Sequence, residues 1–342
     1  MILAGDVGGT KTLLGLFQNT GGKLRCVREA SLPSREFSSF EAIVDEFLAG
    51  AKTRIRRCAV GVAGPVIRGR SQVVNLRWPV DARKLARRLG VAEVRVLNDL
   101  EATAWGIPGL SPRKTFNLTP GVRLRPGNAA LIAAGTGLGM ALLLWDGERY
   151  HPQASEGGHQ GFGPRDDFEI DLLKFLQRRY GRASVERAVS GPGVSTIYQF
   201  LVESGRGKMS PRMERRLAEA DDPNAVIARA GLAGEDAVAE QALDRFISMY
   251  GAAAGDLALV ARATGGIFVG GGIAPKILPG LRKGAFLRAF RAKGRLTPLL
   301  EQIPIRVILE PRTALFGAAA CAVALGAGRT PSLRRTERKT RG

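Results

Sequence analysis

The chain has 342 residues, 45% hydrophobic and 24% charged, a composition that excludes a wholly disordered protein and predicts two or three domain-sized units. No run reaches the roughly 18–20 apolar residues of a membrane span. Three scattered cysteines and only two histidines argue against a structural zinc site. The opening residues lack a basic region and reach an acid at Asp6, unlike a signal peptide, so we expect a cytoplasmic protein with reduced thiols.

The formal net charge is +20, from 51 Lys+Arg against 31 Asp+Glu. Two interpretations stay open, namely a solvated, arginine-rich surface and a basic surface that binds an anionic partner. Part of the charge lies in a basic C-terminal tail, residues 328–342, which lacks apolar periodicity and is expected to be disordered.

Short apolar runs punctuated by glycines predict a meander of strands at 2–6, 12–17 and 23–30. A helix is expected over 40–48, with a capping box formed by Ser38 and Glu41. Alternating elements follow, expected at strand 58–63, helix 81–89 and strand 93–97.

The same opening recurs in the second half of the chain. An apolar strand at 129–134 ends in a glycine-rich turn and is followed by a returning strand at 140–145. Beyond residue 165 the pattern is mostly helical, with strands expected at 267–269 and 304–309 and a helix at 313–326. The pattern indicates an α/β protein with two lobes and a weak internal repeat.

Three glycine-rich segments are candidates for binding phosphate. Residues 5–12 nearly match a P-loop, and residues 135–139 nearly match a dinucleotide motif, but neither is followed by a helix. Each alone fits a tight hairpin equally well. Together with Gly270–Gly272 they predict a nucleotide held between two related halves.

Candidate polar groups follow the strands and turns. Asn98 and Asp99 come directly after a strand and fit either a helix N-cap or a functional carboxylate. Glu156 and His159 are separated by two glycines, which disfavours a metal-binding helix and favours a loop that faces a polyhydroxyl ligand. Glu186 precedes residues 190–193, where we expect a helix to end, and fits either a solvated surface or a functional position.

An ordered set of motifs resembles the bacterial ATP-dependent glucokinases of the non-zinc class, within the hexokinase and actin-like ATPase superfamily. The resemblance covers roughly residues 2–326 and rests on these segments: Gly5–Thr10, Val96–Asp99, Gly135–Gly139, Glu156–His159, Glu186–Arg187, Ser190–Gly193, Gly265–Phe268, Gly270–Pro275, Lys293–Arg295 and Ile303–Ile305. It implies a two-lobed actin-like ATPase (ribonuclease H-like) fold with duplicated strand–Gly-turn–strand openings and a central interlobe cleft. The small lobe would comprise 1–104 with 312–327, and the large lobe 105–311.

The resemblance also implies site residues. Asp99 would be the catalytic base that deprotonates the sugar 6-hydroxyl, and the same motifs would hold the sugar through Asn98, Asp99, Glu156, His159 and Glu186. The nucleotide would be bound by Gly5, Asp6, Val7, Gly8, Gly9, Thr10, Gly135, Thr136, Gly137, Gly270, Gly271 and Gly272. Asp6 would contact Mg²⁺ through water, and no zinc is expected.

Two departures from the family pattern and three alternatives accompany this expectation. Lys11 stands where these glucokinases commonly carry Asn, and Gly161 replaces an acid often found after the histidine. The resemblance implies a homodimer that binds glucose and ATP. The alternatives are another hexose, polyphosphate as the donor, or a sugar-responsive regulator that binds nucleic acid.

Overall fold

The computed structural model describes residues 1–51, 53–73 and 76–325. Its contacts divide the chain into two units, Met1–Ile107 with the C-terminal segment that begins at Arg312, and Pro108–Pro311. The predicted basic tail, 328–342, lies outside the described residues. Within the described part of the chain, no helix is both long and apolar enough to cross a bilayer.

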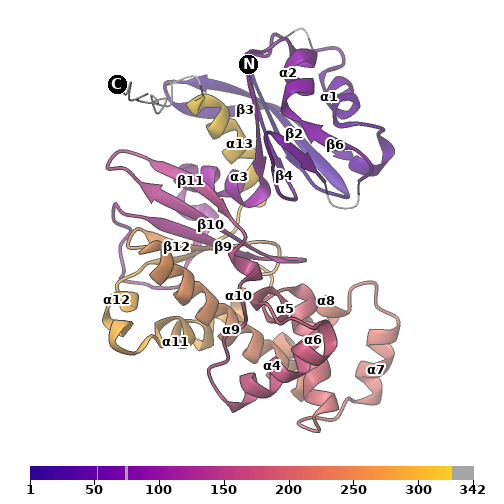
Figure 1. Cartoon of the computed structure of the whole chain (residues 1–342), viewed down its shortest axis with the longest axis vertical. Coiled ribbons are helices and arrows are strands. Elements are labelled where there is room, and N and C mark those ends of the chain that lie inside the picture. The colour runs from indigo at the N-terminus through magenta and orange to yellow at the C-terminus, as the bar shows by residue number, and fades with distance from the viewer. Residues whose placement is uncertain (52, 74–75, 326–342) are drawn as a thin grey trace, which may run out of the picture. The chain divides into compact units, whose positions relative to one another are not determined.

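The first unit is built on a five-stranded sheet of order β3-β2-β1-β4-β7 (Figure 1). β1 pairs antiparallel with β2 and parallel with β4, which pairs parallel with β7. The strands of this unit are β1 (Ile2–Val7), β2 (Lys11–Thr20), β3 (Lys23–Pro33), β4 (Arg57–Val62), β7 (Val94–Asn98) and the separate pair β5 (Arg70–Gln72) and β6 (Pro79–Asp81).

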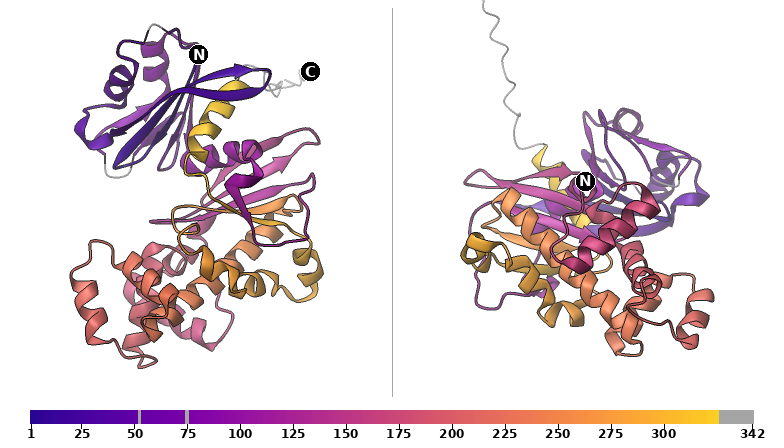
Figure 2. Two further views of the ribbon diagram at one scale, coloured as in Figure 1. Left: turned by 180° about the vertical axis from the view of Figure 1, so that it is seen from behind. Right: turned by 60° about the horizontal axis from the view of Figure 1, so that its bottom comes forward.

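Successive side chains of β1 enter two different cores because they point to opposite faces of the sheet. Leu3 and Val7 pack with α1 (Phe40–Leu48) and α2 (Ala82–Leu89) on one face. Ile2 and Ala4 belong to the core that includes α3 (Asp99–Gly106) and α13 (Thr313–Ala324) on the other (Figure 2). Central strands of this kind are apolar on both faces, as the continuous apolar runs predict.

The predicted capping box at α1 is wrong by one residue. Ser39, not Ser38, is the N-cap, because its backbone is extended (φ −159°) immediately before the helix and its side chain accepts a hydrogen bond from the Ala42 amide. By contrast, α2 begins close to where the sequence predicts it: Asp81 is its N-cap and accepts hydrogen bonds from the amides of Arg83 and Lys84.

The second unit contains a six-stranded sheet of order β11-β10-β9-β12-β13-β8. Its strands are β8 (Thr115–Asn117), β9 (Ala129–Ala134), β10 (Leu138–Trp145), β11 (Tyr150–Ser155), β12 (Gly266–Gly270) and β13 (Ile305–Ile308). β9 pairs antiparallel with β10 and parallel with β12, as β1 pairs with β2 and β4, so the duplicated opening is confirmed. The sequence pattern did not predict β11, an edge strand interrupted by Pro152, which an edge position tolerates.

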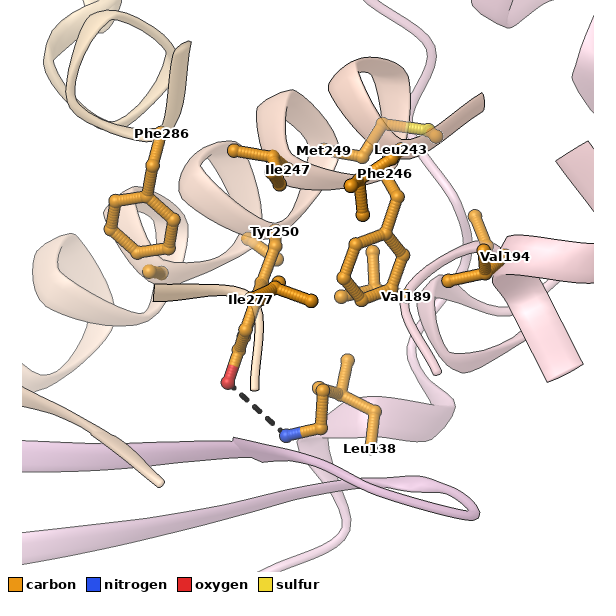
Figure 3. Packing of buried hydrophobic residues seen from close by; sticks show 14 of the residues in the cluster. Leu138, Val189, Val194, Leu243, Phe246, Ile247, Met249, Tyr250, Ile277 and Phe286 are labelled. Atoms are coloured by element: carbon orange, nitrogen blue, oxygen red, sulfur yellow. Dashed lines mark hydrogen bonds between the residues drawn. The ribbon is translucent and has the colours of Figure 1, made fainter. Parts of the chain in front are cut away.

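The long helix α9 (Ala237–Ala261) lies at the centre of this unit's core and packs against β9 and β12 (Figures 1 and 3). The other helices are α4 (Asp167–Tyr180), α5 (Val185–Ala188), α6 (Gly191–Glu203), α7 (Pro211–Ala218), α8 (Pro223–Ala233), α10 (Leu278–Arg282), α11 (Ala285–Arg291) and α12 (Thr297–Glu301).

A helix does end just before residues 190–193, since α5 stops at Ala188 with Val189 as its C-cap, but the sequence did not predict the second helix that begins within them. Ser190 is the N-cap of α6, and its side chain accepts a hydrogen bond from the Gly193 amide at 3.2 Å. Pro192 is the second helical residue, a position where its missing N–H costs nothing.

Candidate active site

The predicted polar segments of the first unit meet at one edge of its sheet. β1, β4 and β7 are parallel, and their register aligns Val7 with Val62 and Val62 with Asn98. The carboxyl ends of the three strands therefore lie side by side. The glycine turn after β1 and the Asn98–Asp99 pair are separated only by the end of β4, the arrangement in which α/β sheets bind ligands.

Asn98 is the N-cap of α3, and Asp99 is the first residue of that helix. The Asn98 side chain accepts a hydrogen bond from the Leu100 amide at 2.9 Å and donates one to the Gly64 carbonyl at 3.2 Å. The half-buried Asp99 carboxylate also accepts from the Leu100 amide, at 2.9 Å. The positive end of the helix thus faces this carboxylate and stabilises its charge. The predicted cap is therefore confirmed for Asn98, whereas a functional role of the Asp99 carboxylate stays a prediction.

The turn at residues 8–10 is supported by a buried pair of hydroxyls that the motifs did not reveal. Ser34 Oγ donates to the Gly8 carbonyl at 2.8 Å and lies 2.9 Å from Thr12 Oγ1, and both side chains are fully buried. The Ser34 amide donates to the Thr10 carbonyl at 2.9 Å. Ser34 thus donates hydrogen bonds to the carbonyls of both Gly8 and Thr10, and these bonds stabilise the conformation of the turn.

Asp6 is the candidate carboxylate for a metal ion. Burial raises the pKa of Asp6 to about 6, against the opposing effect of the nearby Lys11 charge. No group of three or more potential metal-ligating side chains occurs among residues 1–51, 53–73 and 76–325. A single carboxylate fits Mg²⁺, which proteins usually hold through one or two carboxylates, water and substrate phosphates.

Replacing Asp6 with Asn is expected to stabilise the protein more at pH 8 than at pH 4. The raised pKa means that the folded state favours the protonated carboxyl. This contribution to stability is present below pH 3.8 and is lost as the pH rises through about 6. Thermal melting of both proteins across this range measures the effect. Asp244→Asn, on an exposed position of α9, is the control for exchanging aspartate for asparagine at the surface. A pH-independent difference for Asp6→Asn would contradict the assignment.

In the second unit, the glycine loop (residues 135–137) joins β9 to β10. The Gly135 amide donates to the Gly137 carbonyl, and the Gly191 amide at the start of α6 donates to the Gly135 carbonyl, both at 2.8 Å. Gly271 packs against the base of this loop, where a Cβ would lie 2.3 Å from the Ala134 carbonyl oxygen, and its φ of +81° also favours glycine. The predicted loops at 135–137 and 270–272 are therefore neighbours.

A cavity of about 540 Å³ opens beside both loops. Gly135, Thr136 and Gly272 line it together with residues that no motif singled out. The latter include three polar side chains, Asp222, Asn224 and Lys276. Its volume lies in the range of pockets for small organic ligands and cofactors.

Tyr250 connects the strands that carry the two loops. Its hydroxyl accepts a hydrogen bond from the Ala134 amide at 3.1 Å, drawn as the dashed line in Figure 3, and lies 3.3 and 3.4 Å from the carbonyl oxygens of Ile132 and Gly270. The ring packs beside Phe246 and Phe286. A tyrosine 116 residues along the chain thus fixes the end of β9.

Tyr250→Phe is expected to lower the free energy of unfolding by about 1–3 kcal/mol, because it leaves the buried Ala134 amide without its acceptor. Urea denaturation measures this loss. Tyr198→Phe is the matched control, since the buried Tyr198 hydroxyl has no hydrogen-bond partner within the described part of the chain. An equal loss in both variants would contradict the role given to Tyr250.

Glu156, His159 and Glu186 lie together in the second unit. The first two belong to a loop (the 156–162 loop) that contains a 3₁₀ turn, Gly157–His159. His159 Nε2 lies 4.0 Å from Glu156 Oε2, and His159 Nδ1 lies 3.8 Å from Glu186 Oε1. Glu156 and His159 are exposed, whereas the Glu186 side chain is 25% exposed. Two carboxylates on either side of an imidazole provide acceptors and a donor for several hydroxyl groups.

Solved structures with the same architecture define the class. The crystal structure of a glucokinase from an Antarctic psychrotroph superposes with a TM-score of 0.84 at 28% identity, covering 94% of this chain and 98% of that chain. A ROK family glucokinase from Streptomyces griseus, in complex with glucose and AMPPNP, shares the fold with a TM-score of 0.61 at 23% identity, covering 94% and 99% of the two chains. The fold is that of sugar kinases with an actin-like ATPase architecture.

Sequence comparison identifies the family within that class. The Glucokinase family model matches residues 3–325. A glucokinase from Trichormus variabilis is 40% identical over 340 residues, covering 95% of this chain and 99% of that protein. A glucokinase from Synechocystis is 38% identical over 344 residues, covering 94% and 97%. The chain belongs to the glucokinase family, as the motifs indicated.

Proposed function

We propose that this sugar kinase transfers the γ-phosphoryl group of ATP to the 6-hydroxyl of D-glucose, giving glucose 6-phosphate and ADP. The observation that carries the proposal is the cluster of Glu156, His159 and Glu186 in the unit that also holds the glycine loop and its cavity. The cluster suits a polyhydroxyl ligand, and the cavity suits a nucleoside. Membership of the glucokinase family supports the same pairing of substrates.

Asp99 acts as the general base. Its carboxylate takes the proton of the 6-hydroxyl as that oxygen attacks the γ-phosphorus. Asn98 fixes the start of α3 through its bonds to Leu100 and Gly64, which holds the base in place. Transfer needs this base and the groups of the second unit to act on the same pair of substrates.

The other polar groups orient the sugar. Asn98, Glu156, His159 and Glu186 hold hydroxyls that do not react, so that the 6-hydroxyl is presented in the geometry for attack. Hydrogen bonds from hydroxyls to carboxylates are stronger than those between neutral groups, which favours sugars over smaller alcohols.

Backbone groups bind the nucleotide. The end of β1 with the turn that follows it, residues 5–10, and the glycine loop with Thr136 contact phosphates, and Gly270–Gly272 borders the nucleoside in the cavity. Asp6 would hold Mg²⁺ through water, and the ion would supply positive charge that neutralises the phosphates. Asn224 and Lys276 line the same cavity and contribute to nucleoside binding. We also propose that the enzyme is cytoplasmic and works as a homodimer.

A second donor deserves a direct test. Lys11 is exposed beside the phosphate-binding turn, and the chain carries a net charge of +20, so polyphosphate would be attracted to the protein. The second alternative keeps ATP as the donor and replaces glucose by another hexose as the acceptor.

The experiment is a coupled assay of sugar phosphate formation with Mg²⁺. ATP and polyphosphate are compared as donors, and glucose, mannose and glucosamine as acceptors. Product from glucose and ATP supports the proposal. Product from polyphosphate alone would overturn the donor, and product from another hexose alone would overturn the acceptor. No product with any pair would overturn kinase activity on these sugars, and a DNA-binding assay would then address the regulator alternative.

A further inference from the structure

The segment Ala183–Gly191, here called the linking segment, is bonded at its first end to the 156–162 loop. The Phe162 amide donates to the Ala183 carbonyl at 3.1 Å, and the Val185 amide donates to the Gln160 carbonyl at 3.0 Å. Backbone hydrogen bonds in both directions therefore tie the two stretches to each other.

At its other end, the linking segment is bonded to the glycine loop. Glu186 Oε2 accepts a hydrogen bond from the Leu138 amide at 2.9 Å, and the Gly191 amide donates to the Gly135 carbonyl at 2.8 Å. Gly137 approaches the same carboxylate so closely that a Cβ there would lie 2.6 Å from Glu186 Oε2. Both sides of the glycine loop are therefore held by one short stretch of chain.

The 156–162 loop also touches the strand after the glycine loop directly. Gly158 packs on the Leu138 carbonyl, where a Cβ would lie 1.9 Å from the oxygen. The peptide groups of Leu138 are thus held by Glu186 at the amide and by Gly158 at the carbonyl. A shift of either contact moves the start of β10.

We infer that Glu186 is a positioning residue that couples the sugar to the nucleotide, with Oε1 facing His159 and the sugar hydroxyls and Oε2 bonded to the Leu138 amide directly after the glycine loop. The inference rests on the proposed function, in which His159 and Glu186 face the sugar and the glycine loop faces phosphate. A sugar that fixes the Glu186 carboxylate also fixes the Leu138 amide, and so the loop. By thermodynamic linkage, the nucleotide must raise the affinity for sugar by the same factor.

The test measures that factor. Calorimetry gives the affinity for Mg²⁺-AMPPNP with and without saturating glucose. We expect glucose to raise the affinity of the wild-type protein about 5–150-fold, the ordinary range of coupling between sites. Glu186→Ala should reduce this ratio toward 1. Glu186→Gln keeps an oxygen acceptor for the Leu138 amide and should restore most of it.

Glu156→Ala is the matched control. Glu156 lies on the other side of His159, so its loss should weaken glucose binding and leave the ratio at saturating glucose unchanged. A ratio for Glu186→Ala within twofold of wild type overturns the inference, as does an equal fall in Glu156→Ala. If the wild-type protein binds both ligands but glucose leaves its affinity for Mg²⁺-AMPPNP unchanged, the inferred coupling is overturned and the proposed function is not. A wild-type protein that does not bind glucose overturns the proposed function as well.

Hydrogen exchange covers the case in which Glu186→Ala does not fold. In the wild-type protein, glucose without nucleotide should slow exchange of the Leu138 amide. If bound glucose leaves the exchange rate of the Leu138 amide unchanged, the inference is overturned, because the sugar then does not strengthen the hydrogen bond between that amide and Glu186.

Discussion

Asp99→Asn is expected to lower kcat for glucose phosphorylation by about 10²–10⁴-fold, the usual contribution of a general base. The amide cannot accept the proton of the 6-hydroxyl, yet its oxygen can still accept from the Leu100 amide, so the start of α3 should stay intact. The KM for glucose should change far less than kcat, because the base acts in the transition state. Steady-state kinetics with varied glucose separates the two parameters.

Glu101→Gln provides the control for this measurement. Glu101 is another acid in the first turn of α3, with a side chain only 14% exposed and an ion-pair contact to Arg95. Its neutralisation should leave kcat within about threefold of wild type, since it is assigned no contact with substrate. If Asp99→Asn also kept kcat within tenfold, Asp99 would serve only the helix terminus.

The hairpins that carry the glycine turns could be predicted because their signals are local. The strand at residues 2–6, the turn after it and the returning strand are contiguous, and the same holds for residues 129–145. Asn98 was recognisable as a cap because its residue type and its place after a strand suffice. Local chemistry was incomplete at residues 190–193, since the glycines after Ser190 indicate the end of α5 but not the start of α6, which follows directly.

The remainder of the site depends on contacts between distant parts of the chain. Glu186 bonds Leu138 across 48 residues, and Tyr250 bonds Ala134 across 116. No motif around Glu186 or Tyr250 indicates which distant residue it contacts. From its sequence position alone, Glu186 also fits a solvated residue at the surface. Asn224 and Lys276 likewise reach the cavity beside the glycine loop only because α8 and the segment after β12 lie next to α6. Such pairings follow from the topology of the fold, which a one-dimensional pattern does not specify.

Gly158→Ala is expected to raise the KM for glucose by at least tenfold and to lower the free energy of unfolding by about 1–3 kcal/mol, the usual cost of overpacking. The new methyl group would lie 1.9 Å from the Leu138 carbonyl oxygen and 3.0 Å from its carbon, and backbone atoms of a central strand pair cannot move away cheaply. The 156–162 loop must therefore lift from β10, which displaces Glu156 and His159. Glucose kinetics and urea denaturation of the same protein measure both effects.

Gly161→Ala is the matched substitution for this prediction. It lies in the same loop, a Cβ there would meet nothing within 4 Å, and its backbone is not in the left-handed region. It should leave the KM and the stability close to wild type, which separates a general effect of stiffening the loop from the specific contact with Leu138. Equal changes in the two variants would show that the loop tolerates alanine at neither position. The close packing of Gly158 on β10 would then not explain how Glu156 and His159 are positioned.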